Sequence, residues 1–205
     1  MIARMRHRAT IAPGDTGFVN RMVTSAANYR AAMVGDLVAS LAFFAVGLRW
    51  FVGPPSMAGG IVLLGFLFFG LLEYAAHRWI LHGPTSIATR GHARHHAQPT
   101  ALVATPFFVI VIASLAVWKL LCLVCPAGPA ALLVFGLYAG YNYFAVFHHW
   151  EHHHGANAAW GAYWRRLDRL HHLHHQRQVV NFGISTTIWD RVFGTFQAPG
   201  ETTRH

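Results

Sequence analysis

The chain has 205 residues, a length typical of one domain, and 54% of them are apolar while only 11% are charged. Soluble domains carry roughly 25% charged residues, so this deficit indicates a membrane protein. The formal net charge is +9, but the basic residues lie at the ends of apolar runs and not on one polar face. This placement argues against a nucleic-acid partner and favours membrane topology signals and contacts with anionic lipid headgroups.

Residues 1–30 are polar and basic, and we expect a cytoplasmic N-terminal segment there. Four apolar runs follow, and each approaches the ~20 residues that a helix needs to cross a hydrocarbon core. Beyond Trp150 the chain is polar again, with helical character in residues 158–178. The four predicted transmembrane helices cover approximately residues 31–52, 60–81, 101–125 and 127–147.

The distribution of arginine predicts the orientation in the membrane. If the N-terminal segment, residues 77–100 and the C-terminal region share one side, that side carries fourteen arginines. The other side then carries only Arg49 and Lys119. Because loops rich in Lys and Arg stay in the cytoplasm, we expect both termini and both histidine-rich segments to be cytoplasmic.

Histidine is the residue type that carries the chemistry, since fourteen of the sixteen histidines lie between His77 and His175. Two segments have the pattern H-x-x-H-H, in which positions i, i+3 and i+4 share one helix face. A third group, His149 and His153, has the spacing i, i+4. His77 and His82 are five residues apart, about 140° on an ideal α-helix, so we expect the helix to end or bend between them. Gly83-Pro84 directly afterwards fits a helix end.

These groups offer ten imidazoles, enough for two metals with about five nitrogens each, and imidazole suits iron, zinc, copper and nickel alike. The third group can also take the register His148/His152. Ligating imidazoles donate their second N–H to a carboxylate, carbonyl or water, so nearby polar residues could orient them. The candidates for this orienting role are Glu73, Asp168, Asn181 and Asp190. The predicted metal ligands are His77, His82, His92, His95, His96, His149, His153, His171, His174 and His175.

The combination of these histidine groups, opened by Glu73-Tyr74-x-x-His77-Arg78, resembles the fatty acid hydroxylase / sterol desaturase superfamily. The segment from Phe182 to Thr195 is similar to the end of that domain, especially in fatty acid 2-hydroxylases that lack a cytochrome b5 domain. The resemblance covers most of the chain and implies a hydroxylase-like membrane domain at residues 31–196, followed by a polar tail at 197–205.

The fold implied is an all-α membrane protein with about four transmembrane helices and a cytoplasmic helical cap that holds a histidine-rich dimetal site. The resemblance implies two iron ions as the working cofactor, with zinc as a substitute in a purified form. It also implies dioxygen as a substrate and a separate electron donor such as a ferredoxin or cytochrome. The short chain and its preference for arginine over lysine suggest a multi-pass protein of a bacterial inner membrane.

The function implied is hydroxylation of the acyl chain of a fatty acid or lipid taken from the bilayer. Hydroxylation or desaturation of carotenoids or sterols is the alternative within the superfamily. A non-enzymatic metal-binding or metal-transport protein is the alternative of another class. A transporter would need polar ligands near the bilayer midplane, whereas these histidines lie at the ends of the apolar runs.

Overall fold

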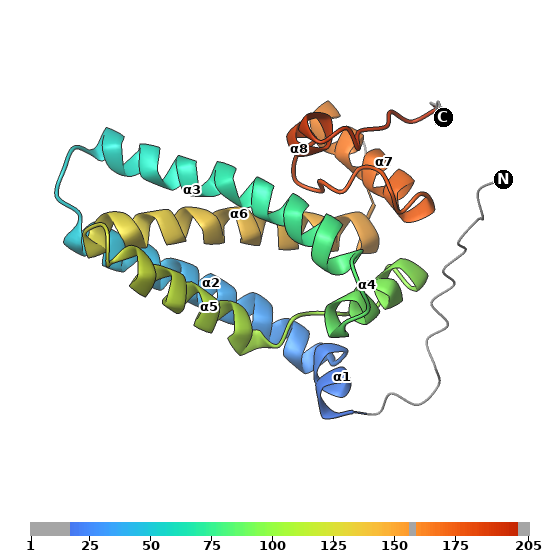
Figure 1. Cartoon of the computed structure of the whole chain (residues 1–205), viewed down its shortest axis with the longest axis horizontal. Helices are drawn as coiled ribbons and strands as arrows, with labels where there is room; N and C mark the ends of the chain where they lie inside the picture. Colours follow the sequence, from blue (N-terminus) through green and yellow to red (C-terminus); the bar gives the residue numbers. More distant parts are fainter. Residues whose placement is uncertain (1–16, 156–158, 201–205) are drawn as a thin grey trace.

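The computed structural model describes residues 17–155 and 159–200, which are helical and contain no strand. Four long helices run along the longest axis of the molecule (Figure 1). Shorter helices gather at one end of these four, and the predicted all-α fold class is confirmed. The long helices are α2 (Ala26–Trp50), α3 (Pro55–Ala75), α5 (Phe107–Leu121) and α6 (Ala127–His153). The short ones are α1 (Phe18–Val23), the π-helix η1 (Ala76–Leu81), α4 (Ile87–Ala97), α7 (Ala162–Gln176) and α8 (Ile188–Val192).

Three helices are long and apolar enough to cross a membrane: α2, α3 continued by η1, and α6. Helix α5 has 15 residues, about 22 Å of helix, which is shorter than a hydrocarbon core. The number of four spans therefore stays a prediction. Helix α2 begins before the predicted run because the Ser25 hydroxyl accepts a hydrogen bond from the Asn28 N–H. The predicted boundary at residue 30 thus falls inside a helix.

The tryptophans mark two levels along the long helices. Trp50 and Trp118 stack at the end away from the short helices, and the Trp118 indole donates to the Ala127 carbonyl at the start of α6. Trp150 lies 23 residues further along α6, about 35 Å away. Because tryptophan favours both membrane–water interfaces, this spacing matches a bilayer with its two aromatic belts. Trp160 lies near this level, with 6.4 Å between its ring centroid and that of Trp150.

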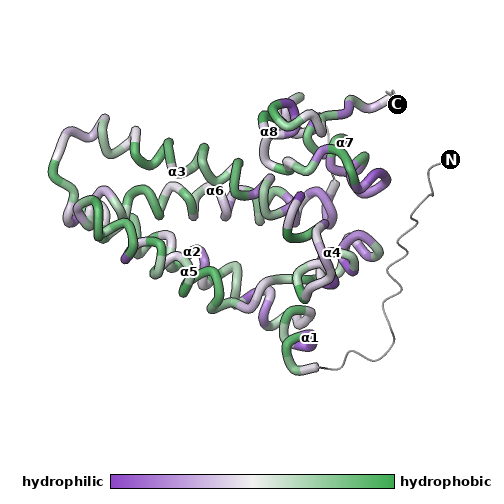
Figure 2. Tube along the Cα trace, in the orientation of Figure 1, coloured by the Kyte–Doolittle hydropathy of each residue, from purple (hydrophilic) through white to green (hydrophobic). Residues whose placement is uncertain are grey.

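Hydropathy separates the long helices from the short helices at their end. In Figure 2 the four long helices are mainly hydrophobic along their length, whereas α4 and α7 are hydrophilic. The long helices also expose many large apolar side chains, among them Leu63, Leu64 and Leu67 on α3. A bilayer around the long helices would cover these side chains, which leaves the short helices at its surface.

Helix α6 packs between α2 and α3 and makes the closest helix contact at two glycines. A Cβ atom on Gly136 would lie 2.2 Å from the Val62 carbonyl oxygen, and one on Gly65 would lie 2.4 Å from the Leu133 carbonyl oxygen. The two Cα positions therefore require glycine, because any side chain would separate the backbones. Small residues of this kind let helices approach closely where no hydrophobic effect drives them together.

We expect Gly136→Val to lower the stability of the purified protein by about 2 kcal/mol or more, because it forces α3 and α6 apart. Gly60→Val on the lipid-facing part of α3 is the matched control, since a Cβ atom at that position would have no neighbour within 4 Å. Thermal unfolding in one detergent measures both variants. Equal unfolding temperatures for the two would show that the close helix contact does not exist.

Candidate metal centre

A change in helix type brings the first pair of histidines, His77 and His82, toward the same side of their helix. Residues 76–81 form a π-helix, in which the His82 N–H bonds to the His77 carbonyl five residues earlier, at 3.1 Å. A π-helix has more residues per turn than an α-helix, so side chains at i and i+5 come closer to one face than they would on an α-helix. The expected break between His77 and His82 is therefore replaced by a wider winding, and the two rings lie 5.1 Å apart.

Helix α4 carries the second group, and its start is fixed by a capping box. The Ser86 hydroxyl accepts from the Thr89 N–H at 3.1 Å, while the Ser86 N–H donates to the Thr89 hydroxyl at 2.7 Å. Fixing the first turn also fixes the direction of each later side chain on the helix. His92 and His96 then face one side of the centre, and His95 faces the other.

The third group differs from its predicted register. His148 and His152 on α6 face α4 and α7, whereas His149 and His153 do not join any cluster. Successive side chains on an α-helix are about 100° apart, so the two pairs cannot share a face. The His149 Nδ1 is instead 2.8 Å from the Tyr29 hydroxyl on α2. The structure thus places His148 and His152, the register that the sequence left as the alternative, in a cluster and leaves the predicted pair His149/His153 outside both.

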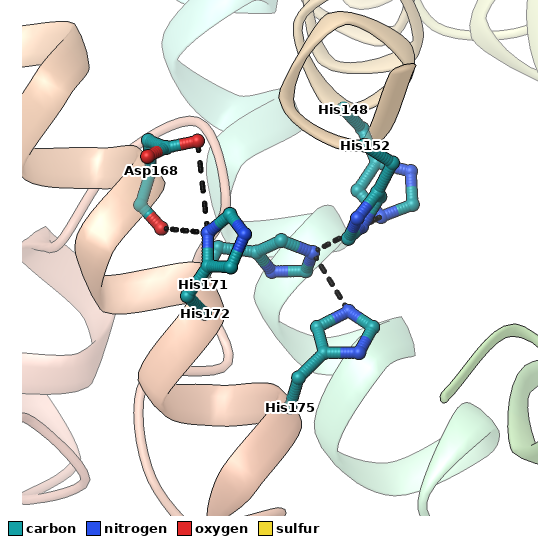
Figure 3. Close-up of polar contacts among 6 residues, drawn as sticks. All are labelled: His148, His152, Asp168, His171, His172 and His175. Atoms are coloured by element: carbon teal, nitrogen blue, oxygen red, sulfur yellow. Dashed lines mark hydrogen bonds and ion pairs between the residues drawn. The ribbon is translucent and has the colours of Figure 1, made fainter. Parts of the chain in front are cut away.

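The fourth group, on α7, supplies both clusters. His174 turns toward the rings from η1, while His171 and His175 turn toward α6, as Figure 3 shows for the second of these directions. Within each cluster, one nitrogen from every ring lies within 4.8 Å of the others. Cluster A contains His77, His82, His92, His96 and His174. Cluster B contains His95, His148, His152, His171 and His175.

The nitrogens within each cluster are arranged as ligands of one cation would be. In cluster A the Nε2 atom of His92 lies 2.9 Å from that of His82 and 3.1 Å from that of His77. In cluster B the Nε2 atom of His171 lies 2.8 Å from that of His152 and 3.1 Å from that of His175. Two nitrogens that each lie about 2.1 Å from a metal at a right angle are about 3 Å apart. The donor set therefore fits a metal ion in each cluster.

Two backbone carbonyls decide which ring nitrogens are free to bind. The His77 Nδ1 lies 2.5 Å from the Phe182 carbonyl oxygen, and the His174 Nδ1 lies 2.8 Å from the Val180 carbonyl oxygen. A carbonyl only accepts, so both Nδ1 atoms carry the proton and both Nε2 atoms present a lone pair to cluster A. Asn181 lies between the two carbonyls with a φ of 54°, a left-handed conformation that asparagine tolerates.

The predicted acidic residues act on this loop and not directly on the histidines. The Asp190 carboxylate accepts from the N–H groups of Phe182 and Gly183, at 2.7 and 2.8 Å. The Glu73 carboxylate accepts from the N–H groups of Ile184 and Ser185, at 2.5 and 3.0 Å. Both carboxylates thereby hold the segment whose carbonyls meet the cluster A histidines. Only the peptide unit between Phe182 and Gly183 separates Asp190 from the His77 ring, and Glu73 binds the next two N–H groups along the loop.

Asn181 and Asp168 have other partners than the ones expected. The Asn181 amide is used by the backbone of Gln197, to which it donates at 3.0 Å and from which it accepts at 2.9 Å. Asp168 approaches His172, which belongs to neither cluster, with 3.6 Å between the carboxylate and the ring (Figure 3). Neither residue reaches a clustered histidine directly. The sequence missed the carbonyls of Val180 and Phe182 entirely, because a backbone acceptor leaves no residue-type signal.

The environment keeps the clustered imidazoles neutral. Burial, followed by the charge of His174, lowers the pKa of His82 and of His95 to about 4. Burial also lowers the pKa of His174 to about 4, against the opposing effect of its bond to Val180. Burial followed by neighbouring histidines lowers the pKa of His96 and of His175 to about 2. Neutral imidazole is the form that binds a metal, so the site is ready for cations at neutral pH.

We expect His148→Ala to lower the metal bound to the purified protein by about one ion per chain, because cluster B loses a ligand. His149→Ala is the matched control, since it changes the neighbouring residue on the same helix turn and leaves both clusters intact. Elemental analysis of the two variants beside the unaltered protein measures the difference. If His149→Ala lost metal and His148→Ala did not, His149 and His153 would be the ligands of the third group.

We expect the metal-free protein to lose stability as the pH falls from about 6.5 to about 4. Unfolded imidazoles have a pKa of about 6.5, and the folded ones bind protons only at lower pH. In that window the unfolded chain binds more protons than the folded chain, so acid favours unfolding. Thermal unfolding of chelator-treated protein at several pH values measures the effect, and a constant or rising unfolding temperature would contradict it.

Comparison with known proteins agrees with this geometry. A family model described as fatty acid hydroxylase matches residues 62–195. A dihydroceramide fatty acyl 2-hydroxylase of Arabidopsis thaliana is 32% identical over 145 residues, which are 67% of this chain and 60% of the plant protein. A fatty acid 2-hydroxylase of Rattus norvegicus is 31% identical over 156 residues, which are 70% of this chain and 41% of the rat protein. The chain therefore spans less than two thirds of the length of these relatives.

A solved structure of full-length Scs7p, in which only the hydroxylase domain is visible, has the same fold. It aligns with a TM-score of 0.72 and 24% identity over 92% of this chain and 73% of that chain. The segment that the family model matches covers more than half of the chain and contains every histidine of clusters A and B. The chain therefore belongs to the fatty acid hydroxylase family.

Proposed function

We propose that the protein is a membrane-bound oxygenase that hydroxylates the acyl chain of a fatty acid or lipid. The observation that carries the proposal is the pair of five-nitrogen clusters at the end of membrane-length helices. Two iron ions, one in each cluster, would supply the redox chemistry that activates dioxygen. Imidazole ligands fit this metal, and the family membership makes iron the first choice.

The overall reaction requires reductant as well as dioxygen. One oxygen atom enters the C–H bond to give an alcohol, and the other leaves as water after uptake of two electrons and two protons. In this scheme the ten histidines bind the metals, and the 180–185 loop holds His77 and His174 in the correct tautomer. No side chain of the chain acts as a nucleophile.

The level of the clusters along the helices favours a particular carbon atom. Both clusters lie beside the belt of tryptophans, at the surface of the proposed bilayer, where lipid headgroups are found. The carbons of an acyl chain nearest to its carboxyl end lie at this level, whereas mid-chain carbons lie about 10 Å or more deeper. This geometry supports hydroxylation close to the carboxyl end, as the names of the 2-hydroxylase relatives describe for those proteins.

The electrons would come from a separate acidic carrier such as a ferredoxin or cytochrome. Asp36, Glu73, Glu151, Asp168 and Asp190 are the acidic residues in the described part of the chain, and all of them are buried. Arg166 and Arg169 are exposed on α7, the same helix that carries histidines of both clusters. Opposite charges at such a face would speed the encounter with an acidic partner. The same arginines support a cytoplasmic location of the clusters and of both termini.

Expression with a reductase and an electron carrier, followed by mass spectrometry of the lipid extract, tests the proposal. We expect fatty acids one oxygen atom heavier than their precursors, with the heavy isotope incorporated when the cells receive labelled dioxygen. His95→Ala should abolish the product, and His149→Ala should retain it. Unchanged lipids in a membrane that holds metal-loaded protein and a working electron supply would refute the proposal, and products two hydrogens lighter would indicate a desaturase.

A further inference from the structure

Helix α8 lies against the membrane-spanning part of α3 and not against the polar cap alone. A Cβ atom on Gly70 would lie 3.2 Å from the Thr186 methyl group and 3.5 Å from the Trp189 indole nitrogen. Gly70 precedes His77 by seven residues, about 10 Å of helix, and lies within a candidate membrane span. Figure 1 shows α8 beside the last third of α3, set back toward the long helices. The start of α8 is therefore deeper than the metal centre.

The outward face of this region is apolar and continuous with the lipid-facing side of α3. Val192 is 63% exposed, and Ile188 on the preceding turn is exposed as well. Phe193 contacts the exposed Trp79 of η1, with 5.8 Å between ring centroids. On α3 the exposed Leu67 and Leu63 lie on the same helix face as Gly70, one and two turns before it. Such a patch is rare on a face in contact with water.

Charged groups border the patch without entering it. The Arg191 guanidinium lies 3.9 Å from the centroid of the Phe196 ring, and the Arg78 guanidinium donates to the Tyr74 hydroxyl at 2.7 Å. The acidic residue of α8, Asp190, is fully buried and bonded to the 182–183 peptide groups. An apolar face with aromatic rings and an arginine border fits the boundary between acyl chains and anionic headgroups.

We propose that residues 186–193, together with Trp79 and Ile80, form an in-plane anchor that inserts into the headgroup and acyl boundary of the bilayer. Anchors of this kind bury their apolar face about 5–10 Å below the surface, which agrees with the depth of Gly70 below His77. The anchor is joined to the metal centre by one short path. Asp190 holds the Phe182 N–H, and the Phe182 carbonyl meets the His77 ring. An α8 held in the lipid would thereby keep the Phe182 carbonyl, and with it the His77 ring, in position.

A spin label on Val192→Cys tests the anchor in vesicles of phosphatidylcholine and phosphatidylglycerol. Cys122 and Cys125, at the opposite end of the long helices, are first replaced by serine. The matched controls are Arg169→Cys on the exposed face of α7 and Leu67→Cys on the lipid-facing side of α3. Collision of the label with oxygen, which concentrates in lipid, is compared with collision with a water-soluble nickel chelate.

We expect the ratio of oxygen to chelate accessibility at Val192→Cys to exceed the ratio at Arg169→Cys several-fold and to approach that at Leu67→Cys. Ile188→Cys provides a second label on the same face if the first variant folds poorly. A ratio equal to that of Arg169→Cys would overturn the proposal, and so would protection from both reagents, which would indicate a protein partner. The measurement needs neither metal nor turnover, so its outcome is independent of the proposed oxygenase activity.

Discussion

The structure depends on ten imidazole rings that each turn one nitrogen toward one of two small spaces. The His77 and His174 rings have their protons held on Nδ1 by backbone carbonyls, so their Nε2 lone pairs point into cluster A and repel other lone pairs there unless a proton or a cation lies between them. Burial makes the alternative, protonation, unfavourable, as the low pKa values of His82 and His95 show. A metal ion in each cluster would resolve both constraints. The capping box of α4, the π-turn and the 180–185 loop are the features that impose this convergence.

The membrane and the metal centre are parts of one arrangement. The long helices α3 and α6 approach to backbone contact at Gly65 and Gly136. Helix α3 continues into η1, which carries His77, and α6 ends with His148 and His152 in its last turns. The polar helices α4 and α7 then close the centre from outside the bilayer. Hydrophobic substrate and polar reactants would thus reach the same centre from opposite sides, the acyl chain from the lipid and the electrons from the aqueous face.

Much of this arrangement could be predicted from the sequence, and the exceptions have physical reasons. Apolar runs located the ends of the long helices to within six residues, because the ~20-residue length of a span is a strong constraint. The spacing i, i+3, i+4 pointed to the histidines of α4 and α7, and the structure divides each triplet between the two clusters. It could not choose between His148/His152 and His149/His153, since both pairs have the same spacing and only the contacts of α6 separate them. The His77/His82 pair required a π-helix, which residue spacing alone does not reveal.

The central claim is that each cluster holds its own metal ion. Anomalous diffraction at the iron edge, recorded from crystals of the iron-loaded protein, tests it directly. The account predicts two peaks, one among His77, His82, His92, His96 and His174 and the other among His95, His148, His152, His171 and His175. A single peak, or iron bound at His149 and His153, would contradict it.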